Sequence, residues 1–221
     1  MKSATLFAAA GLFLGLVGAG QAVAAEPGRP GSSPWYIHTG PLVVKYDESA
    51  KISVGGGQIP GARVKADSNY SVGIEAGYKF TKNWAVSLTV GAPPNAILVG
   101  TGPLEGVKLG KVMYGPAVLS GHYHFTNFGP KFEPYVGAGV NYTIVLRDKD
   151  AAVQNLKVKS PVGLVLQAGV ESQINDRIGV FVDAKQIFLD TDATGTVGGA
   201  PASAEIQLNP LIVMAGVSVH F

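Results

Sequence analysis

The C-terminal segment of the chain, residues 211–221, alternates between two sets of side chains. One set is apolar throughout and consists of Leu211, Val213, Ala215, Val217, Val219 and Phe221. The residues between them are mixed and partly polar. Because successive side chains of a β-strand point to opposite faces, this period predicts a strand with one wholly apolar face. A soluble barrel of the ligand-carrier type would expose that face to water, so the pattern indicates a strand that faces lipid.

The same period recurs along the chain and predicts eight strands in all. The other seven span residues 34–46, 69–80, 84–99, 112–125, 136–144, 162–170 and 178–190. Short connections alternate with longer polar or glycine-rich segments, which we expect to be loops. The short ones are residues 81–83, 126–133 and 175–177, and the long ones are 47–68, 100–111, 148–159 and 193–204. This alternation is typical of up-and-down outer-membrane barrels, in which both termini lie on the periplasmic side.

Composition favours a chain that is embedded in a membrane. Of the 221 residues, 47% are apolar and only 14% are charged, an apolar balance that is high for a soluble domain. Beyond the N-terminal segment, no stretch offers the roughly 18 consecutive apolar residues that a helical span needs. Lipid cannot solvate an open sheet edge, so the strands must close on themselves. The predicted fold class is therefore all-β, an eight-stranded antiparallel up-and-down transmembrane β-barrel.

The first 25 residues resemble a secretory signal peptide. Lys2 precedes an apolar run over residues 4–20, and Val23 and Ala25 suit the last positions before a cleavage site. We therefore expect residues 1–25 to be removed. Residues 26–221 then form a single barrel domain in the bacterial outer membrane.

Charge and cysteine content exclude several other functions. Without Lys2, 16 Lys and Arg stand against 15 Asp and Glu, a net charge of +1. Nucleic-acid binding needs many clustered cations, so we expect no nucleic-acid partner. The absence of cysteine excludes a disulfide scaffold, thiolate catalysis and thiolate metal sites.

Aromatic residues gather near the predicted short turns and the C-terminus, where we expect them to form the periplasmic girdle. They are Tyr78, Phe80, Trp84, Tyr123, Phe125, Tyr135 and Phe221. The terminal Phe221 and the alternating strand before it also resemble the signal that outer-membrane insertion machinery reads. We therefore expect that machinery to be a partner.

Four charged residues, Glu75, Glu171, Asp183 and Lys185, occupy inward positions of their strands. Buried charges must be paired, and we expect Asp183 and Lys185 to pair with each other or with the two glutamates. One interpretation is a salt-bridge plug that fills the interior. The other is a polar floor beneath an apolar cavity, which would stop a hydrophobic solute from reaching the periplasm. The cavity walls would be Leu42, Val44, Thr89, Val118, Ile212 and Met214.

His122 and His124 are two apart on one strand and share its inward face. Metal binding needs three or more convergent donors, and no third ligand is evident. We therefore expect a hydrogen-bonded pair that belongs to the polar floor. Ser120 beside His122 could act in a hydrolase, but barrel enzymes that act on lipid need an outward site, so we expect no catalysis and no cofactor.

Three prolines, Pro93, Pro94 and Pro116, lie in the outer halves of the third and fourth predicted strands. Proline removes a backbone donor from a wall in which polar groups should be paired. They indicate either a local bulge or early strand end above the bilayer, or a lateral gap between the two strands.

Several sequence strings carry a family resemblance. PYVGAGVNYT at 134–143, YGPAVLSGHYHF at 114–125 and LNPLIVMAGVSVHF at 208–221 resemble the OmpW family of eight-stranded outer-membrane proteins. VGGGQIPGA at 54–62 and TGTVGGAPAS at 194–203 are similar to its AlkL-like, alkane-uptake branch. The resemblance implies a narrow barrel that takes small hydrophobic molecules through the lipopolysaccharide layer and releases them sideways into the bilayer.

The expected function is thus passive uptake of small hydrophobic molecules, with outer-membrane lipid, lipopolysaccharide and the solutes themselves as partners. Alkanes, terpenes, quinones and detergents are all candidate solutes. The alternative is a structural or host-contact barrel with a closed interior, whose exposed loops do the work.

Overall fold

The structure is a computed structural model that describes residues 33–66, 69–93, 95–129 and 131–221. The predicted signal peptide, residues 1–25, lies outside these described residues. Within them, no helix is long and apolar enough to cross a bilayer.

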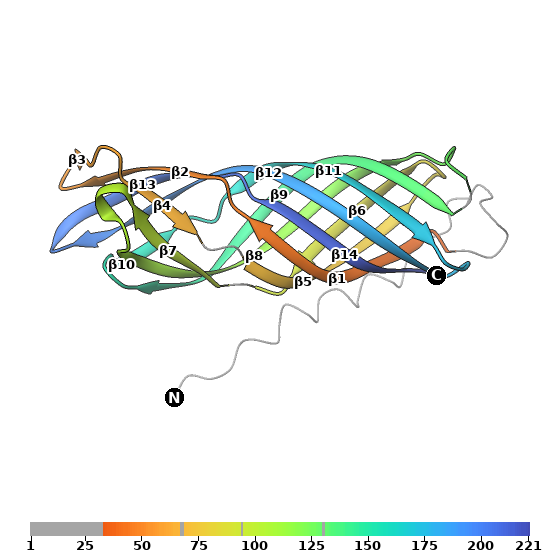
Figure 1. Cartoon of the computed structure of the whole chain (residues 1–221), viewed down its shortest axis with the longest axis horizontal. Helices are drawn as coiled ribbons and strands as arrows, with labels where there is room; N and C mark the ends of the chain where they lie inside the picture. The colour runs from red at the N-terminus through yellow and green to blue at the C-terminus, as the bar shows by residue number, and fades with distance from the viewer. Residues whose placement is uncertain (1–32, 67–68, 94, 130) are drawn as a thin grey trace, which may run out of the picture.

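Eight strands form a closed antiparallel ring (Figure 1). They are β1 (Trp35–Lys45), β5 (Asn69–Lys79), β6 (Trp84–Gly91), β8 (Lys108–His124), β9 (Phe132–Asp150), β11 (Val162–Gln173), β12 (Ile178–Val197) and β14 (Leu211–His220). Each strand pairs with the next in this order, and β14 returns to pair with β1. Because the ring has no open edge, its backbone groups can be paired within the wall. The predicted fold class is confirmed.

The two faces of each strand follow the predicted period. On β14, Val213 and Val217 are exposed, whereas Met214 and Ser218 are almost fully buried. On β11, Leu164 and Leu166 are exposed, whereas Val165 and Gln167, which alternate with them, are almost fully buried. The outward apolar side chains would meet lipid, and the inward ones fill the lumen.

The four long connections are not loops, and this prediction is wrong. They contain β2 (Glu48–Val54), β3 (Gly57–Gln58), β4 (Arg63–Ala66), β10 (Gln154–Val158), most of β13 (Ala200–Leu208), the outer end of β12, and a 3-10 turn, Gly102–Leu104. These segments pair with one another and extend the wall beyond the eight-stranded ring, at the end opposite the C-terminus (Figure 1). We call this part of the wall the outer extension. Inward and outward side chains continue to alternate in these segments. Ile52, Leu156 and Ile206 are buried there and belong to two further apolar clusters.

Glycines make the tight turns of this outer extension. Gly55 and Gly56 follow β2 with φ angles of 60° and 82°, a region that only glycine adopts readily. The glycine-rich string that starts there is thus a turn.

The prediction of one continuous third strand over residues 84–99 is also wrong, because the structure has two shorter strands there. β6 ends at Gly91, and β7 (Asn95–Thr101) begins after Pro93 and Pro94. Pro94 itself lies outside the described residues. Proline cannot donate to the ladder, which accounts for the break at this point.

Aromatic side chains do gather at the end that carries the C-terminus. Phe80, Trp84 and Phe221 are exposed there, and the Trp84 ring packs edge-on against Tyr123, with 5.1 Å between centroids. The prediction that Tyr135 belongs to the girdle is wrong, because Tyr135 is 1% exposed and lies inside the barrel. Its neighbour Val136 points outward, and nearness to a turn fixes the height of a residue in the wall, not its face.

Candidate functional site

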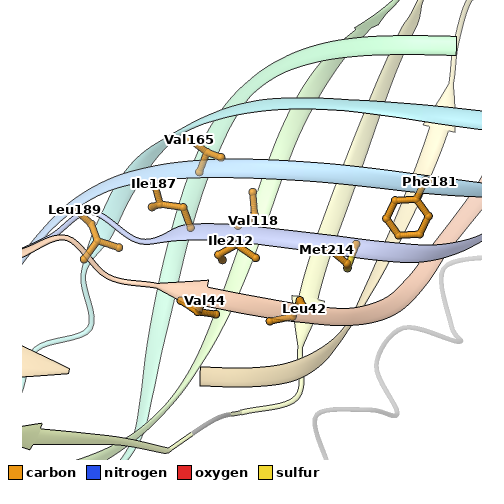
Figure 2. Packing of buried hydrophobic residues seen from close by; sticks show 9 residues of the cluster. All are labelled: Leu42, Val44, Val118, Val165, Phe181, Ile187, Leu189, Ile212 and Met214. Carbon is orange, nitrogen blue, oxygen red and sulfur yellow. The ribbon is translucent and has the colours of Figure 1, made fainter. Parts of the chain in front are cut away.

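An apolar cavity, here named the lower cavity, lies in the middle of the barrel. All six residues predicted to line the lumen contact it, namely Leu42, Val44, Thr89, Val118, Ile212 and Met214. Five of them also belong to one buried cluster with Val165, Phe181, Ile187 and Leu189, and Figure 2 shows these side chains converging from several strands. The cluster forms because each strand places every second side chain in the lumen.

Lys185 lines the lower cavity at its polar end. Its Nζ atom lies 3.0 Å from Oε2 of Glu75 and also contacts the carboxylate of Asp183. The Thr89 hydroxyl donates a hydrogen bond of 2.6 Å to the same Glu75 oxygen. Glu75, Asp183 and Lys185 are each at most 1% exposed, so this ion-pair network is buried.

Glu171 does not reach Lys185, so that part of the pairing prediction is corrected. Its carboxylate lies 3.2 Å from Nε2 of His38 and 2.5 Å from Nε2 of His220, and it accepts a 2.8 Å hydrogen bond from the Ser218 hydroxyl. In the strand register, Glu171 stands opposite Phe181, while Lys185 stands opposite Gln167. Glu171 therefore lies nearer the end of the barrel that carries the C-terminus, where histidines are its available partners.

A layer of aromatic and amide side chains fills the space around these charges. Tyr135 donates a 2.9 Å hydrogen bond to Asp183, and its ring stacks on both His122 and His124. Gln167 donates a 2.7 Å hydrogen bond to Asp183 and lies 3.0 Å from Nε2 of His122. The predicted floor residues Glu75, His122, His124, Glu171, Asp183 and Lys185 are thus all buried inside the barrel, and we call this set the polar floor.

Several members of this layer were missed by sequence reasoning. They are Tyr36, His38, Tyr135, Gln167, Ser218 and His220. His38 bridges the two carboxylate groups, because its Nδ1 atom lies 3.4 Å from Glu75 while Nε2 faces Glu171. The signal was present, since His38 shares the inward face of its strand with Leu42 and Val44.

Neither the metal nor the hydrolase interpretation gains support from this geometry. Among the described residues, no group of three or more His, Asp and Glu side chains is arranged to hold a metal ion. Ser120 is 1% exposed and points into the barrel, and its Oγ atom has no hydrogen-bond partner in the described part of the chain. A serine without a base is not activated for attack.

The wall is interrupted beside the lower cavity. β8 pairs with β6 as far as Ala117, opposite Val90, and with β7 from Met113, opposite Asn95. Between these points, the described residues 91–93 make no register with residues 114–116 of β8. We call this segment the wall interruption. Its members Gly91, Ala92, Tyr114 and Pro116 line the lower cavity together with the lumenal side chains.

An upper cavity lies in the outer extension. Its walls include Val64, Leu98, Val112, Val145 and Ile206. Tyr46 and Tyr114 contact both cavities, and their hydroxyl groups touch. Tyr46 follows β1 and Tyr114 lies on β8, which are not neighbours in the ring, so the contact crosses the lumen between the two cavities.

These features define a small outer-membrane barrel protein, with a lipid-facing wall, a polar floor and apolar cavities above it. Residues 34–221 match the OmpW family, and the chain belongs to that family. The family resemblance of the sequence is thereby confirmed, and the protein is an outer-membrane barrel and not an enzyme.

Individual relatives cover most of the chain. The dibenzothiophene metabolism operon protein PahQ of Pseudomonas aeruginosa is 33% identical, covering 89% of this chain and 93% of that protein. The outer membrane protein AlkL of Ectopseudomonas oleovorans is 31% identical, covering 79% of this chain and 76% of its own. The crystal structure of OprG from Pseudomonas aeruginosa has a TM-score of 0.80 at 24% identity, covering 86% and 97% of the two chains, and supports the fold.

Proposed function

We propose that this protein is a passive channel for small hydrophobic molecules, which enter at the outer end and leave sideways into the bilayer through the wall interruption. The observation that carries the proposal is the set of residues that line the lower cavity. Its lining joins buried lumenal residues such as Leu42 and Met214 to Ala92 and Pro116 of the interruption. An apolar molecule in this cavity would therefore stand beside both the lumen and the wall.

The polar floor makes passage to the periplasm unfavourable. Lys185 is held by Glu75 and Asp183, and no apolar solute could replace those partners. Separating a buried ion pair leaves charges without compensation, which costs several kcal/mol. The floor thus closes the axial route below the lower cavity.

The lateral route has the opposite energetics. Leu119 and Val90, next to the interruption, are half-exposed on the lipid-facing side of the wall. A solute that leaves there passes from an apolar cavity into an apolar solvent and never exposes its surface to water. Proline at positions 93 and 116 also lowers the number of backbone donors that must be satisfied where the ladder stops.

The name of PahQ supports the class of solute, since dibenzothiophene is an apolar aromatic compound. The proposal for this chain is limited to small hydrophobic molecules. No covalent step and no cofactor is part of it.

Liposomes that contain the folded protein test the proposal. A panel of radiolabelled solutes, such as an alkane, a terpene and a polycyclic aromatic, is offered from outside, with glucose as a polar control. We expect protein-dependent uptake of at least one hydrophobic solute and none of glucose. A closed structural barrel would transport none of them, and uptake of glucose would indicate a water-filled pore instead.

A further inference from the structure

The outer extension carries positive charge on one side of its circumference. On the neighbouring strands β4, β7, β8 and β9, the strand register places Lys65 opposite Val99 and Val99 opposite Lys108. It likewise places Ile97 opposite Lys111 and Lys111 opposite Lys149. Residues that stand opposite each other in an antiparallel pair share a face. We call the resulting outward set the basic face, and it comprises Arg63, Lys65, Lys108, Lys111, Arg147 and Lys149.

The outward direction of these side chains follows from burial. Val64 and Val112, which alternate with them, are buried inside the extension. Five of the six cations are exposed, and Lys111 is half-buried. The cations therefore point away from the cavities and toward the surroundings of the barrel.

Acidic side chains of the same strands are turned away from this face. Asp148 and Asp150 alternate with Arg147 and Lys149, and their carboxylates accept hydrogen bonds from backbone amides of residues 155, 156 and 158. Glu105 lies in the turn between β7 and β8, at the tip of the extension. Like charges that stand opposite each other, as Lys111 and Lys149 do, destabilise a strand pair unless an anion lies between them.

The opposite side of the extension has a different charge balance. On β2, β12 and β13, the outward residues include Lys51, Asp190, Asp192 and Glu205, and Lys159 forms an ion pair with Asp192. Both signs are mixed there. An excess of positive over negative charge is thus specific to the side of the barrel that contains the wall interruption.

The basic face begins where the lipid-facing surface ends. Outward apolar residues of β9 run from Val136 to Leu146. A strand of that length with a tilt of about 40° rises roughly 25 Å, the height of the apolar band of such barrels. The register with β8 shifts at Leu146, which stands as an extra residue between Val145 and Arg147, so Leu146 and Arg147 are both exposed although they are adjacent in sequence. On β9, the change from apolar to cationic surface therefore occurs within one residue, at the level of lipid headgroups.

We propose that the basic face binds the phosphorylated sugar headgroup of lipopolysaccharide in the outer leaflet. Four strands that are about 4.8 Å apart span roughly 15 Å, which is wider than one phosphate group. The basic face contains two pairs of lysines, one formed by Lys111 and Lys149 and the other by Lys65 and Lys108. A headgroup with phosphates on more than one sugar can contact both pairs at once, whereas a phospholipid offers one phosphate. Arg147 adds a planar donor that suits phosphate oxygens. Bound glycolipid then lies at the outer edge of the wall interruption.

Titration of the folded protein in nonionic detergent micelles with purified lipopolysaccharide, followed by native mass spectrometry, tests this proposal. We compare the double variant Lys111→Gln/Lys149→Gln with the double variant Lys51→Gln/Lys159→Gln, which removes the same charge from the opposite side. The first should weaken binding about tenfold or more, and the second less than about twofold. Equal losses in both variants would overturn the proposal.

Two further binding measurements use proteins in which the basic face keeps its charge. Wild-type protein should bind enzymatically dephosphorylated lipopolysaccharide, or vesicles of phosphatidylglycerol, much more weakly than intact lipopolysaccharide. Equal binding of either would contradict a site for phosphorylated glycolipid. The variant Lys111→Arg/Lys149→Arg should bind as wild type does, and heat-modifiable gel mobility reports whether each variant is folded.

Discussion

The Nζ atom of Lys185 on β12 lies 3.0 Å from the carboxylate of Glu75 on β5, across the interior of the barrel. Two strands, β14 and β1, separate β12 from β5 in the ring. The ion pair therefore ties distant parts of the wall together beneath the lower cavity. It also fixes the level at which an apolar lumen gives way to a polar one.

The first prediction concerns the partner of this ion pair, Asp183. It accepts hydrogen bonds from Tyr135 and Gln167 and contacts Lys185 at 1% exposure. Asp183→Ala should therefore lower the free energy of unfolding by about 3 to 5 kcal/mol, because it leaves a buried lysine with one partner fewer. Urea unfolding in detergent micelles measures the loss. Asp190→Ala, at an exposed position of the same strand, is the control, and a loss below about 1 kcal/mol at Asp183 would indicate a wet channel instead of a sealed floor.

The second prediction concerns the terminal residue, Phe221. Its amide donates a hydrogen bond to the Trp35 carbonyl, and its carbonyl accepts one from the Ser33 amide, where β14 meets β1. Deletion of Phe221 should reduce the folded fraction in outer membranes, because the closing strand loses both its anchor and the terminal aromatic that insertion machinery is expected to read. Heat-modifiable gel mobility reports the folded fraction. Phe128→Ala, at an exposed turn position, should leave it unchanged, and an undiminished folded fraction after the deletion would remove Phe221 from this role.

The third prediction concerns the contact between Tyr46 and Tyr114, which separates the two cavities. Tyr114→Phe removes one hydroxyl, and a hydrogen bond of this kind contributes about 1 kcal/mol. If opening this contact limits uptake, the rate of uptake into liposomes should rise about fivefold. Tyr142→Phe, on the lipid-facing side of β9, is the matched control. No change in rate at Tyr114 would mean that solutes do not pass between these rings.

Much of the wall could be predicted from the sequence because a period of two fixes the face of every residue in a strand. Alternation is sufficient to assign Val118 and Met214 to the lumen, and Val213 and Leu164 to the lipid, and their burial and exposure agree. Tyr135 shows the limit of reasoning from position along the chain. Its place near a turn suggested the girdle, while the alternation around Val136 already implied the lumen.

The outer extension was harder to predict because its residues are polar on one face and lie outside the lipid. Glycine-rich and charged strings there resemble loops, yet Ile52 and Ile206 keep the alternation and are buried. Pairing inside the floor could not be predicted either. Alternation places Glu171 inward, but only the register between strands shows that His38 and His220, and not Lys185, are within its reach.

Lateral release through the wall interruption is the central claim, and a reversible crosslink tests it most directly. A Cβ atom on Gly115 would lie 3.7 Å from Cγ of Pro93, so Pro93→Cys with Gly115→Cys can join the two sides of the interruption. The chain has no cysteine of its own. As a control, Val86→Cys with Gly121→Cys joins the same two sides of the wall where β6 and β8 are already paired. We predict that oxidation of the first pair lowers hydrophobic-solute uptake to the level of protein-free liposomes, that reduction restores it, and that the control pair has no effect. Unchanged uptake in a fully crosslinked Pro93→Cys/Gly115→Cys sample would contradict lateral release at this site.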